Sequence, residues 1–298
     1  MNRTVRPRFG QDRYLGPLLV LPTLAVLSIT ILYPLASVVL YSFQKVGLGP
    51  NGKTDWVGLD NYRAALNQGS FVGSLSTSIV VATSSVLITI ALGLAIAVLL
   101  DGQFRGRSLA RSLIVLPWAM PTFAAAFAWR WMLDYNYGAV NKIIEASGAD
   151  PIAFLSTNPT ALITAIMVYV WKGLPWAIIV LLAGLQSVPR ELREAARVDG
   201  ASPRWEFRHV ALPHIRFVVQ IVAVLLFVWN FNWFDMMWLL TQGGPGGGTR
   251  ILPIDIYRQA FTAFNFGQAS AIAVTVLVLL LGFAAVVFRV TSREEEAL

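Results

Sequence analysis

Cysteine is absent from the 298-residue sequence, and it contains only two histidines. Without cysteine the chain can form no disulfide, no thiolate nucleophile and no cysteine-ligated metal site. The histidines, His209 and His214, are separated by four residues that include a proline, which is a poor arrangement for holding one ion. We therefore expect no metal site in this chain.

Charge is also scarce. Charged residues make up 13% of the chain and hydrophobic residues 56%. This is too little charge to cover the surface of a water-soluble domain of the same length. A hydrocarbon core about 30 Å thick is crossed by roughly 20 apolar residues in one helix, which pairs its own backbone groups. The long apolar runs therefore predict an all-α integral membrane protein that contacts lipid.

Six apolar segments predict six transmembrane helices. They lie at 15–43, 73–100, 110–133, 160–186, 217–240 and 268–290. The first run follows several arginines, as a signal peptide would, but it is far longer than a signal-peptide core and lacks a convincing cleavage site. We expect it to be retained as a helix.

Basic residues are divided unequally between the two sides of these spans. Fifteen fall on one side: Arg3, Arg6, Arg8, Arg13, Arg105, Arg107, Arg111, Arg190, Arg193, Arg197, Arg204, Arg208, Arg216, Arg289 and Arg293. Seven fall on the other: Lys45, Lys53, Arg63, Arg130, Lys142, Arg250 and Arg258. Because Lys and Arg favour cytoplasmic loops, both termini should be cytoplasmic. The net charge of +7 then reflects orientation, and we expect no nucleic-acid partner.

The most polar part of the chain is the loop 187–216 on the cytoplasmic side. Its residues predict two short helices joined by a bend: Gly200 suits a helix C-terminus, Ser202 an N-cap and Pro203 the first helical position. Pro213 is expected to stop the second helix. The pattern alone fits both a docking element for another protein and an amphipathic connector between two spans.

The spacing of small and charged residues in this loop favours a docking element over a connector. Glu-Ala-Ala, three residues, Gly, nine residues, a branched aliphatic, one residue and Leu-Pro resembles the cytoplasmic motif of permease subunits of ABC-type importers. The matching residues are Glu194, Ala195, Ala196, Gly200, Val210, Leu212 and Pro213, with Asp199 adding charge at the turn. That family usually has Ile where Val210 stands. The resemblance implies a coupling helix that sits in a cleft of an ATPase subunit.

Further segments resemble the binding-protein-dependent sugar permeases, which import oligosaccharides, polyols and glycerol phosphates. They are WVGLDNY at 56–62, LPWAMP at 116–121, FNWFDMMWLLTQGGPGGGT after the fifth span, and IYRQAF and FNFGQASA beyond it. The resemblance implies a type I importer permease fold at 15–290, with coupling helices at about 189–213 and cytoplasmic tails at 1–14 and 291–298. It also implies alternating access in the cytoplasmic (inner) membrane of a prokaryote.

Several partners follow from the same resemblance. It implies a second permease subunit in a heterodimer, two cytoplasmic ATPase subunits and an extracytoplasmic solute-binding protein. This chain should bind no cofactor itself, since ATP and Mg would be held by the ATPase subunits.

Polar residues within two spans indicate a substrate path. Lys172 and Asp235 are ionisable groups inside apolar segments, which are costly and usually functional. Asn230 and Asn232 accompany Asp235, while Gly173 loosens the helix beside Lys172. Aromatic residues that could stack on sugar faces lie among them: Trp171, Trp176, Trp229, Phe231, Trp233 and Phe234. Two other interpretations stay open: a structural Lys172–Asp235 pair, and interfacial aromatics with helix-bridging asparagines.

Maltose-importing members of the family hold substrate with two regions that align with this chain. Their W-x-G-x-P-aromatic pattern aligns with residues 171–176, and their Asn-Phe-Asn-x-Phe pattern with residues 230–234. Trp233 stands where those members have a further asparagine, which argues against maltose itself.

The sequence favours a transporter component over an enzyme. It has no G-x-x-x-x-G-K-[ST] loop, and the glycine-rich GGPGGGT at 243–249 lacks the lysine that contacts phosphate. We therefore expect no catalytic residues. The two alternatives are an intramembrane enzyme, which would need clustered catalytic groups, and an ion-coupled carrier, which would need more buried acids than Asp235.

Overall fold

The computed structural model describes residues 12–47 and 52–295, and side chains from residue 18 to 289 within that range. The expected tails at 1–14 and 291–298 fall largely outside it. Residues 12–14 and 291–295 belong to the first and last helices, whereas 1–11 and 296–298 lie outside the described residues.

The regular structure is helical apart from one short antiparallel pair, β1 (Gln44–Lys45) and β2 (Asp55–Trp56). The helices are α1 (Asp12–Leu27), α2 (Tyr33–Ser42), α3 (Asp60–Asn67), α4 (Gly69–Asp101), α5 (Arg107–Ala119), α6 (Thr122–Met132), α7 (Ala139–Ala146), α8 (Thr160–Gln186), α9 (Arg190–Val198), α10 (Pro203–Glu206), α11 (Leu212–His214), α12 (Arg216–Phe231), α13 (Phe234–Thr241), α14 (Leu252–Tyr257) and α15 (Phe266–Glu295). Three π-helical segments join some of them: η1 (Ser28–Leu32), η2 (Phe207–Ala211) and η3 (Arg258–Thr262).

Four helical segments are long and apolar enough to cross a membrane: Leu18–Ser42, Gly69–Asp101, Thr160–Gln186 and Phe266–Arg289. Two bent pairs bring the number to six if each pair is one span. These are Arg107–Ala119 with Thr122–Met132, at 93°, and Pro203–His214 with Arg216–Phe231, at 69°. The all-α membrane fold is therefore as expected.

Two of the predicted spans are broken rather than continuous. The segment 110–133 bends between α5 and α6, where Met120 is extended (φ −66°, ψ 135°) in front of Pro121. A residue before proline is pushed out of the helical region. The segment 217–240 is interrupted at Asn232 and Trp233, between α12 and α13. Hydropathy predicted single helices here because it detects apolar length and not helix direction.

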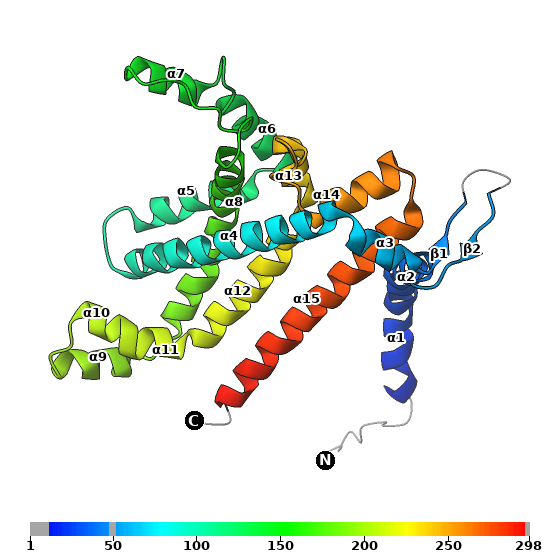
Figure 1. The fold of residues 1–298 in the computed structure, drawn as a ribbon. Helices are drawn as coiled ribbons and strands as arrows, with labels where there is room; N and C mark the ends of the chain where they lie inside the picture. Colours follow the sequence, from blue (N-terminus) through cyan, green and yellow to red (C-terminus); the bar gives the residue numbers. More distant parts are fainter. Residues whose placement is uncertain (1–11, 48–51, 296–298) are drawn as a thin grey trace, which may run out of the picture.

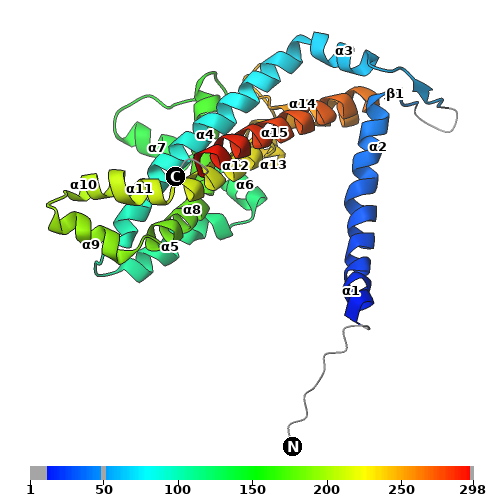
Figure 2. The same ribbon diagram turned by 90° about the horizontal axis from the view of Figure 1, so that it is seen from below.

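The core forms where α4, α8 and α12 cross (Figure 1). Its buried side chains include Ile178, Leu181 and Leu226. Gly93 lets α4 approach α8, since a Cβ at this position would lie 3.1 Å from Leu181 Cδ1. The segment α1–α2 lies apart from this bundle (Figure 2). It contacts α15 through α2. Its apolar segment is unburied within the chain, as expected for a helix that faces lipid or another subunit.

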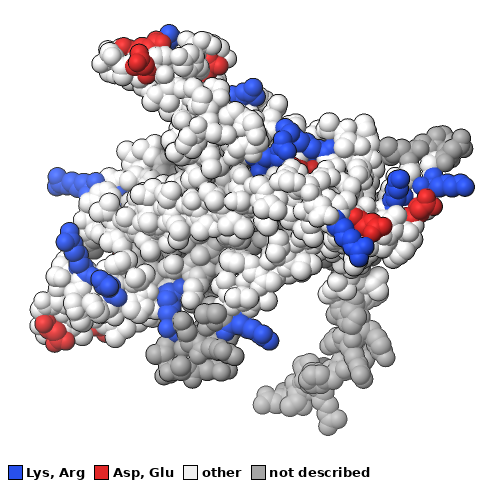
Figure 3. Space-filling view, in the orientation of Figure 1, with Lys and Arg blue, Asp and Glu red and all other residues white. Residues whose placement is uncertain are grey.

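The face shown in Figure 3 carries its Lys and Arg side chains toward the rim, around a broad band with little charge. Such a band suits contact with hydrocarbon. The loop helices α9–α11 and the C-terminus lie toward one edge of the molecule, and the outer helix α7 lies at the opposite edge (Figure 1).

This arrangement makes the predicted orientation testable, because the chain contains no cysteine. Arg204 and Ala149 are both exposed, the first in α10 and the second just after α7. In intact cells, an impermeant thiol reagent should label Ala149→Cys and leave Arg204→Cys unlabelled until the membrane is opened. Labelling of Arg204→Cys from outside would reverse the predicted topology.

Candidate functional site

A cavity of about 440 Å³ lies where the two broken spans meet the middle of α8. Its wall comes from the α5–α6 break, from α8, from α12, and from Trp233 directly before α13. The lining residues are Trp118, Met120, Pro121, Thr122, Lys172, Gly173, Trp176, Leu226, Trp229, Asn230 and Trp233. Both interruptions in the spans therefore border the same space.

Lys172 is the charged residue in this wall, and its side chain is buried. The ammonium group donates to the carbonyl oxygens of Pro117 at 2.9 Å and Trp118 at 3.2 Å, and also to that of Met120. These carbonyls close α5, where the last turn of a helix has no partners of its own and carries partial negative charge. Pro121 removes one further N–H at this point. Lys172 thus stabilises the broken end of α5.

Tryptophan rings and one amide make up much of the remaining wall. The rings of Trp176 and Trp229 meet edge to face at 4.7 Å, and the Tyr169 hydroxyl donates to the Trp233 carbonyl at 2.7 Å. Asn230 is only 3% exposed and lies in the cavity wall. Its amide carries both a donor and an acceptor, which suit the hydroxyl groups of a bound molecule.

The structure brings together some of the predicted substrate-path residues and separates others. Five line the cavity: Lys172, Gly173, Trp176, Asn230 and Trp233. Three do not: Trp171, Asn232 and Asp235.

The three residues outside the cavity have other surroundings. Trp171 packs edge to face on Trp129 at 5.4 Å. Asn232 is exposed and donates to the Val228 carbonyl at 3.0 Å, while Asp235 is exposed in the first turn of α13. Lys172 bonds to carbonyls and forms no recorded ion pair with Asp235 among the described residues, so the open alternative of a structural Lys–Asp pair finds no support.

The sequence analysis did not predict the cavity residues at the α5–α6 break, nor one residue of α12. The missed residues are Trp118, Met120, Pro121, Thr122 and Leu226. The two prolines of LPWAMP were a usable signal, because closely spaced prolines in an apolar run favour a break.

The polar loop 187–216 has the local geometry that its residues predicted. Gly200 has φ +80°, Ser202 Oγ accepts a hydrogen bond from the Trp205 N–H at 3.3 Å, and Pro203 is the first residue of α10. The second helix ends at His214, one residue beyond the predicted stop at Pro213, after a π-helical turn at η2. The chain bends by 69° before α12 begins.

The predicted coupling residues point in two directions. Those exposed on the loop surface are Glu194, Ala195, Asp199, Gly200 and Pro213. Ala196 is buried, and Leu212 packs against the core where α8 and α12 meet. The outer face is therefore free to contact a partner, and the inner face attaches the loop to the spans.

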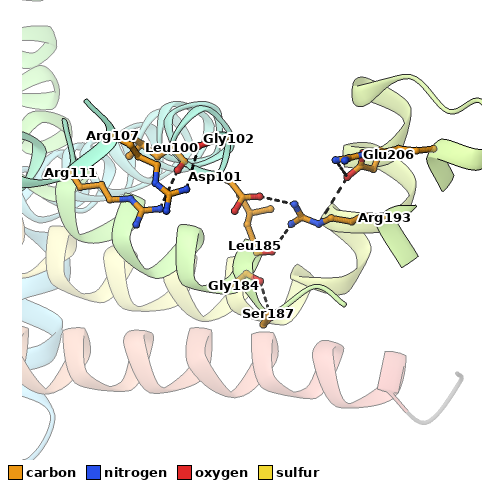
Figure 4. A network of polar contacts seen from close by, with 11 residues as sticks. Leu100, Asp101, Gly102, Arg107, Arg111, Gly184, Leu185, Ser187, Arg193 and Glu206 are labelled. Atoms are coloured by element: carbon orange, nitrogen blue, oxygen red, sulfur yellow. Dashed lines mark hydrogen bonds and ion pairs between the residues drawn. The ribbon is translucent and has the colours of Figure 1, made fainter. Parts of the chain in front are cut away.

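The loop is also held by ion pairs (Figure 4). Arg193 of α9 meets Asp101 at the end of α4, and Arg197 meets Glu206 of α10 at 3.0 Å. The hydrogen bond that Arg197 donates to the Glu206 carboxylate raises the pKa of Arg197 above its ordinary value. Within residues 12–47 and 52–295, no three His, Asp or Glu side chains are placed to hold a metal ion.

Comparison with known proteins identifies the family. The profile described as "Binding-protein-dependent transport system inner membrane component" matches residues 88–291. The chain belongs to this family. It is therefore a multi-pass inner-membrane permease of the ABC type, a transport component and not itself an enzyme, as the sequence had indicated.

Named relatives of this permease extend over nearly the whole chain. The trehalose/maltose transport system permease protein MalF of Thermococcus litoralis is 34% identical over 293 residues, covering 97% of each chain. The inner membrane ABC transporter permease protein YcjO of Escherichia coli is 33% identical and covers 94% of each. The sulfoquinovosyl glycerol transport system permease protein SmoG of Agrobacterium fabrum is 29% identical over 94% of this chain and 91% of its own.

A solved structure confirms the fold of the permease. A chain of a bacterial ABC transporter involved in the import of alginate superposes with a TM-score of 0.84, covering 95% of this chain and 96% of that one. Its sequence identity is 20%, so the likeness concerns the fold alone. The type I importer permease fold that the sequence predicted is therefore present.

Proposed function

We propose that this permease moves an uncharged sugar or sugar-like solute, such as an oligosaccharide or polyol, through the cavity between α5–α6, α8 and α12. The observation that carries the proposal is the combination of Trp118, Trp176, Trp229 and Trp233 with the buried amide of Asn230 in one cavity wall. Sugars present apolar C–H faces and hydroxyl edges, which suit aromatic platforms and an amide. The name of the MalF relative, a trehalose/maltose transport system permease protein, supports this substrate class.

The bonding of Lys172 favours an uncharged substrate over a glycerol phosphate. An ammonium group has three donors, and here three backbone carbonyls accept from it. A phosphate entering the cavity would have to compete with those carbonyls for the charge. A neutral sugar can bind while Lys172 keeps its hydrogen bonds to these carbonyls.

Energy for transport comes, in this proposal, from partner subunits. Two ATPase subunits holding ATP and Mg dock on the exposed face of α9–α10, including Glu194, Ala195, Asp199 and Gly200. A second permease subunit completes the membrane path in a heterodimer, and an extracytoplasmic binding protein delivers the solute. The structure of the alginate transporter with an alginate pentasaccharide-bound periplasmic protein supports the last partner by analogy of fold. ATP binding and hydrolysis then open the cavity to one side of the membrane and to the other in turn.

Asn230→Ala tests the substrate path. Loss of a hydrogen bond between the amide and a sugar hydroxyl removes about 1 kcal/mol, and more if the hydroxyl stays unpaired. We expect uptake by reconstituted complexes to fall about fivefold or to change its preference among sugars. The ATPase subunits should still co-purify, because Asn230 lies at the end of α12 that is away from the loop.

Asn232→Ala is the matched control, since this amide is exposed and bonds to Val228 on its own helix. It should transport at close to the wild-type rate. Uptake by Asn230→Ala that equals wild type in rate and sugar preference would remove Asn230 from the path.

A further inference from the structure

One arginine ties the cytoplasmic loop to two membrane helices. Arg193 lies on α9, within the loop, and its guanidinium group is largely enclosed, with 20% of the side chain exposed. Nη1 donates to Asp101 Oδ2 at 2.6 Å, and Nη2 donates to the Leu185 carbonyl at 2.5 Å. Asp101 is the last residue of α4, and Leu185 lies in the last turn of α8.

A second carboxylate encloses the same arginine from the other side. Arg193 Nε lies 4.0 Å from Glu206 Oε1, and Glu206 also accepts from Arg197 Nε at 3.0 Å. Glu206 is 8% exposed and belongs to α10. Figure 4 shows Arg193 between Asp101 and Leu185 on one side and Glu206 on the other. Its planar fork suits such simultaneous contacts, which a lysine could not reproduce.

The two membrane helices that Arg193 joins lead to the cavity. The helix α8 is continuous from Thr160 to Gln186 and carries Lys172, Gly173 and Trp176 in the cavity wall. The helix α4 packs along α8 over much of its length. A displacement at the Leu185 end of α8 therefore reaches Trp176 in the cavity wall through continuous helix, and Pro175, which cannot donate a backbone hydrogen bond, lies beyond Trp176.

We propose that Arg193 is the positioning residue that passes movement of the α9–α10 loop to α8 and α4, and through them to the cavity wall. The proposal rests on the proposed function, in which ATPase subunits dock on this loop. Arg193 itself faces inward and does not belong to the exposed docking surface. Its removal should separate ATP hydrolysis from transport without releasing the ATPase.

Arg193→Met tests this role in reconstituted complexes of the two permeases, the ATPase and the binding protein. We expect the ATPase to co-purify in normal amount and to hydrolyse ATP, while solute imported per ATP hydrolysed falls at least tenfold. Arg193→Lys, which keeps the charge but loses the fork, should give an intermediate ratio. Arg105→Met is the control, because this exposed arginine lies in the neighbouring loop after α4 and makes the same change in charge.

A charge exchange distinguishes a link from mere support of the fold. Asp101→Arg and Arg193→Asp should each lower the transport-to-hydrolysis ratio, and the double variant should recover more than either single one. A purely structural role predicts that uptake and hydrolysis fall together with the amount of assembled complex. An unchanged ratio in Arg193→Met, or no recovery in the double variant, would overturn the proposal.

Failure of the docking proposal would look different. In that case the wild-type chain itself would not retain the ATPase subunits through purification, whereas failure of the Arg193 inference leaves that association intact.

Discussion

Gly200→Val is expected to abolish uptake while the chain still inserts in the membrane. Gly200 has φ +80°, in the left-handed region between α9 and α10. Left-handed geometry costs an L-residue about 1–2 kcal/mol, and a β-branched residue there is a strong outlier. Valine will therefore shift the turn that sets α9 against α10. Uptake in reconstituted vesicles should fall more than tenfold, and the ATPase should be lost or no longer stimulated by loaded binding protein.

Gly200→Asn separates backbone geometry from the size of the side chain. A Cβ at residue 200 would meet nothing within 4 Å, so the space is open to either residue. Asparagine tolerates the left-handed region far better than valine. Gly200→Asn should keep most of the uptake. Equal activity of both variants would show that this turn does not position a docking element, and equal loss would point to crowding by the partner instead.

The geometry of this loop could be predicted from sequence because its determinants are local. Gly200, Ser202 and Pro203 each prefer one backbone conformation or one cap, whatever surrounds them. The membrane class was equally accessible, since it follows from apolar length alone.

The cavity wall was only partly predictable, because the direction of each helix decides which of its residues line the cavity. Trp171 and Trp176 are both aromatic residues of α8, but Trp171 faces Trp129 and Trp176 faces the cavity. Asn230, in the last turn of α12, lines the cavity, whereas Asn232 comes directly after α12 and is exposed. Positions two residues apart can therefore differ in role at a helix end, and periodicity does not say where the helix ends.

The hydrogen-bond partners of Lys172 could not be predicted from the sequence, for a related reason. Its partners are backbone carbonyls of α5, more than fifty residues earlier in the chain for each bond. Any residue type supplies a carbonyl, so no side-chain pattern marks the partner. The other ionisable residue in an apolar segment, Asp235, suggested an ion pair, but it is exposed in the first turn of α13.

Lys172→Met is expected to destabilise the protein before any substrate is added. The substitution keeps a long side chain but leaves the carbonyls of Pro117, Trp118 and Met120 without their donor. An unsatisfied buried polar group costs about 1–3 kcal/mol, and because these three carbonyls are only partly buried, the total loss should be about 1–3 kcal/mol. The α5–α6 break should loosen, and with it the cavity wall at Trp118. Thermal unfolding of the detergent-solubilised complex should shift down by several degrees, with uptake reduced at least tenfold.

Leu226→Met is the matched control, because it places methionine in the same cavity wall without removing a hydrogen bond. A volume-conserving change of this kind costs less than about 1.5 kcal/mol, so its unfolding temperature should stay near that of wild type. Lys172→Arg keeps several donors and should lie between the two methionine variants. If Lys172→Met unfolds at the wild-type temperature and loses only uptake, the ammonium acts on the solute and not on α5. The cavity would then favour an anionic substrate, since the charge would be free to meet it.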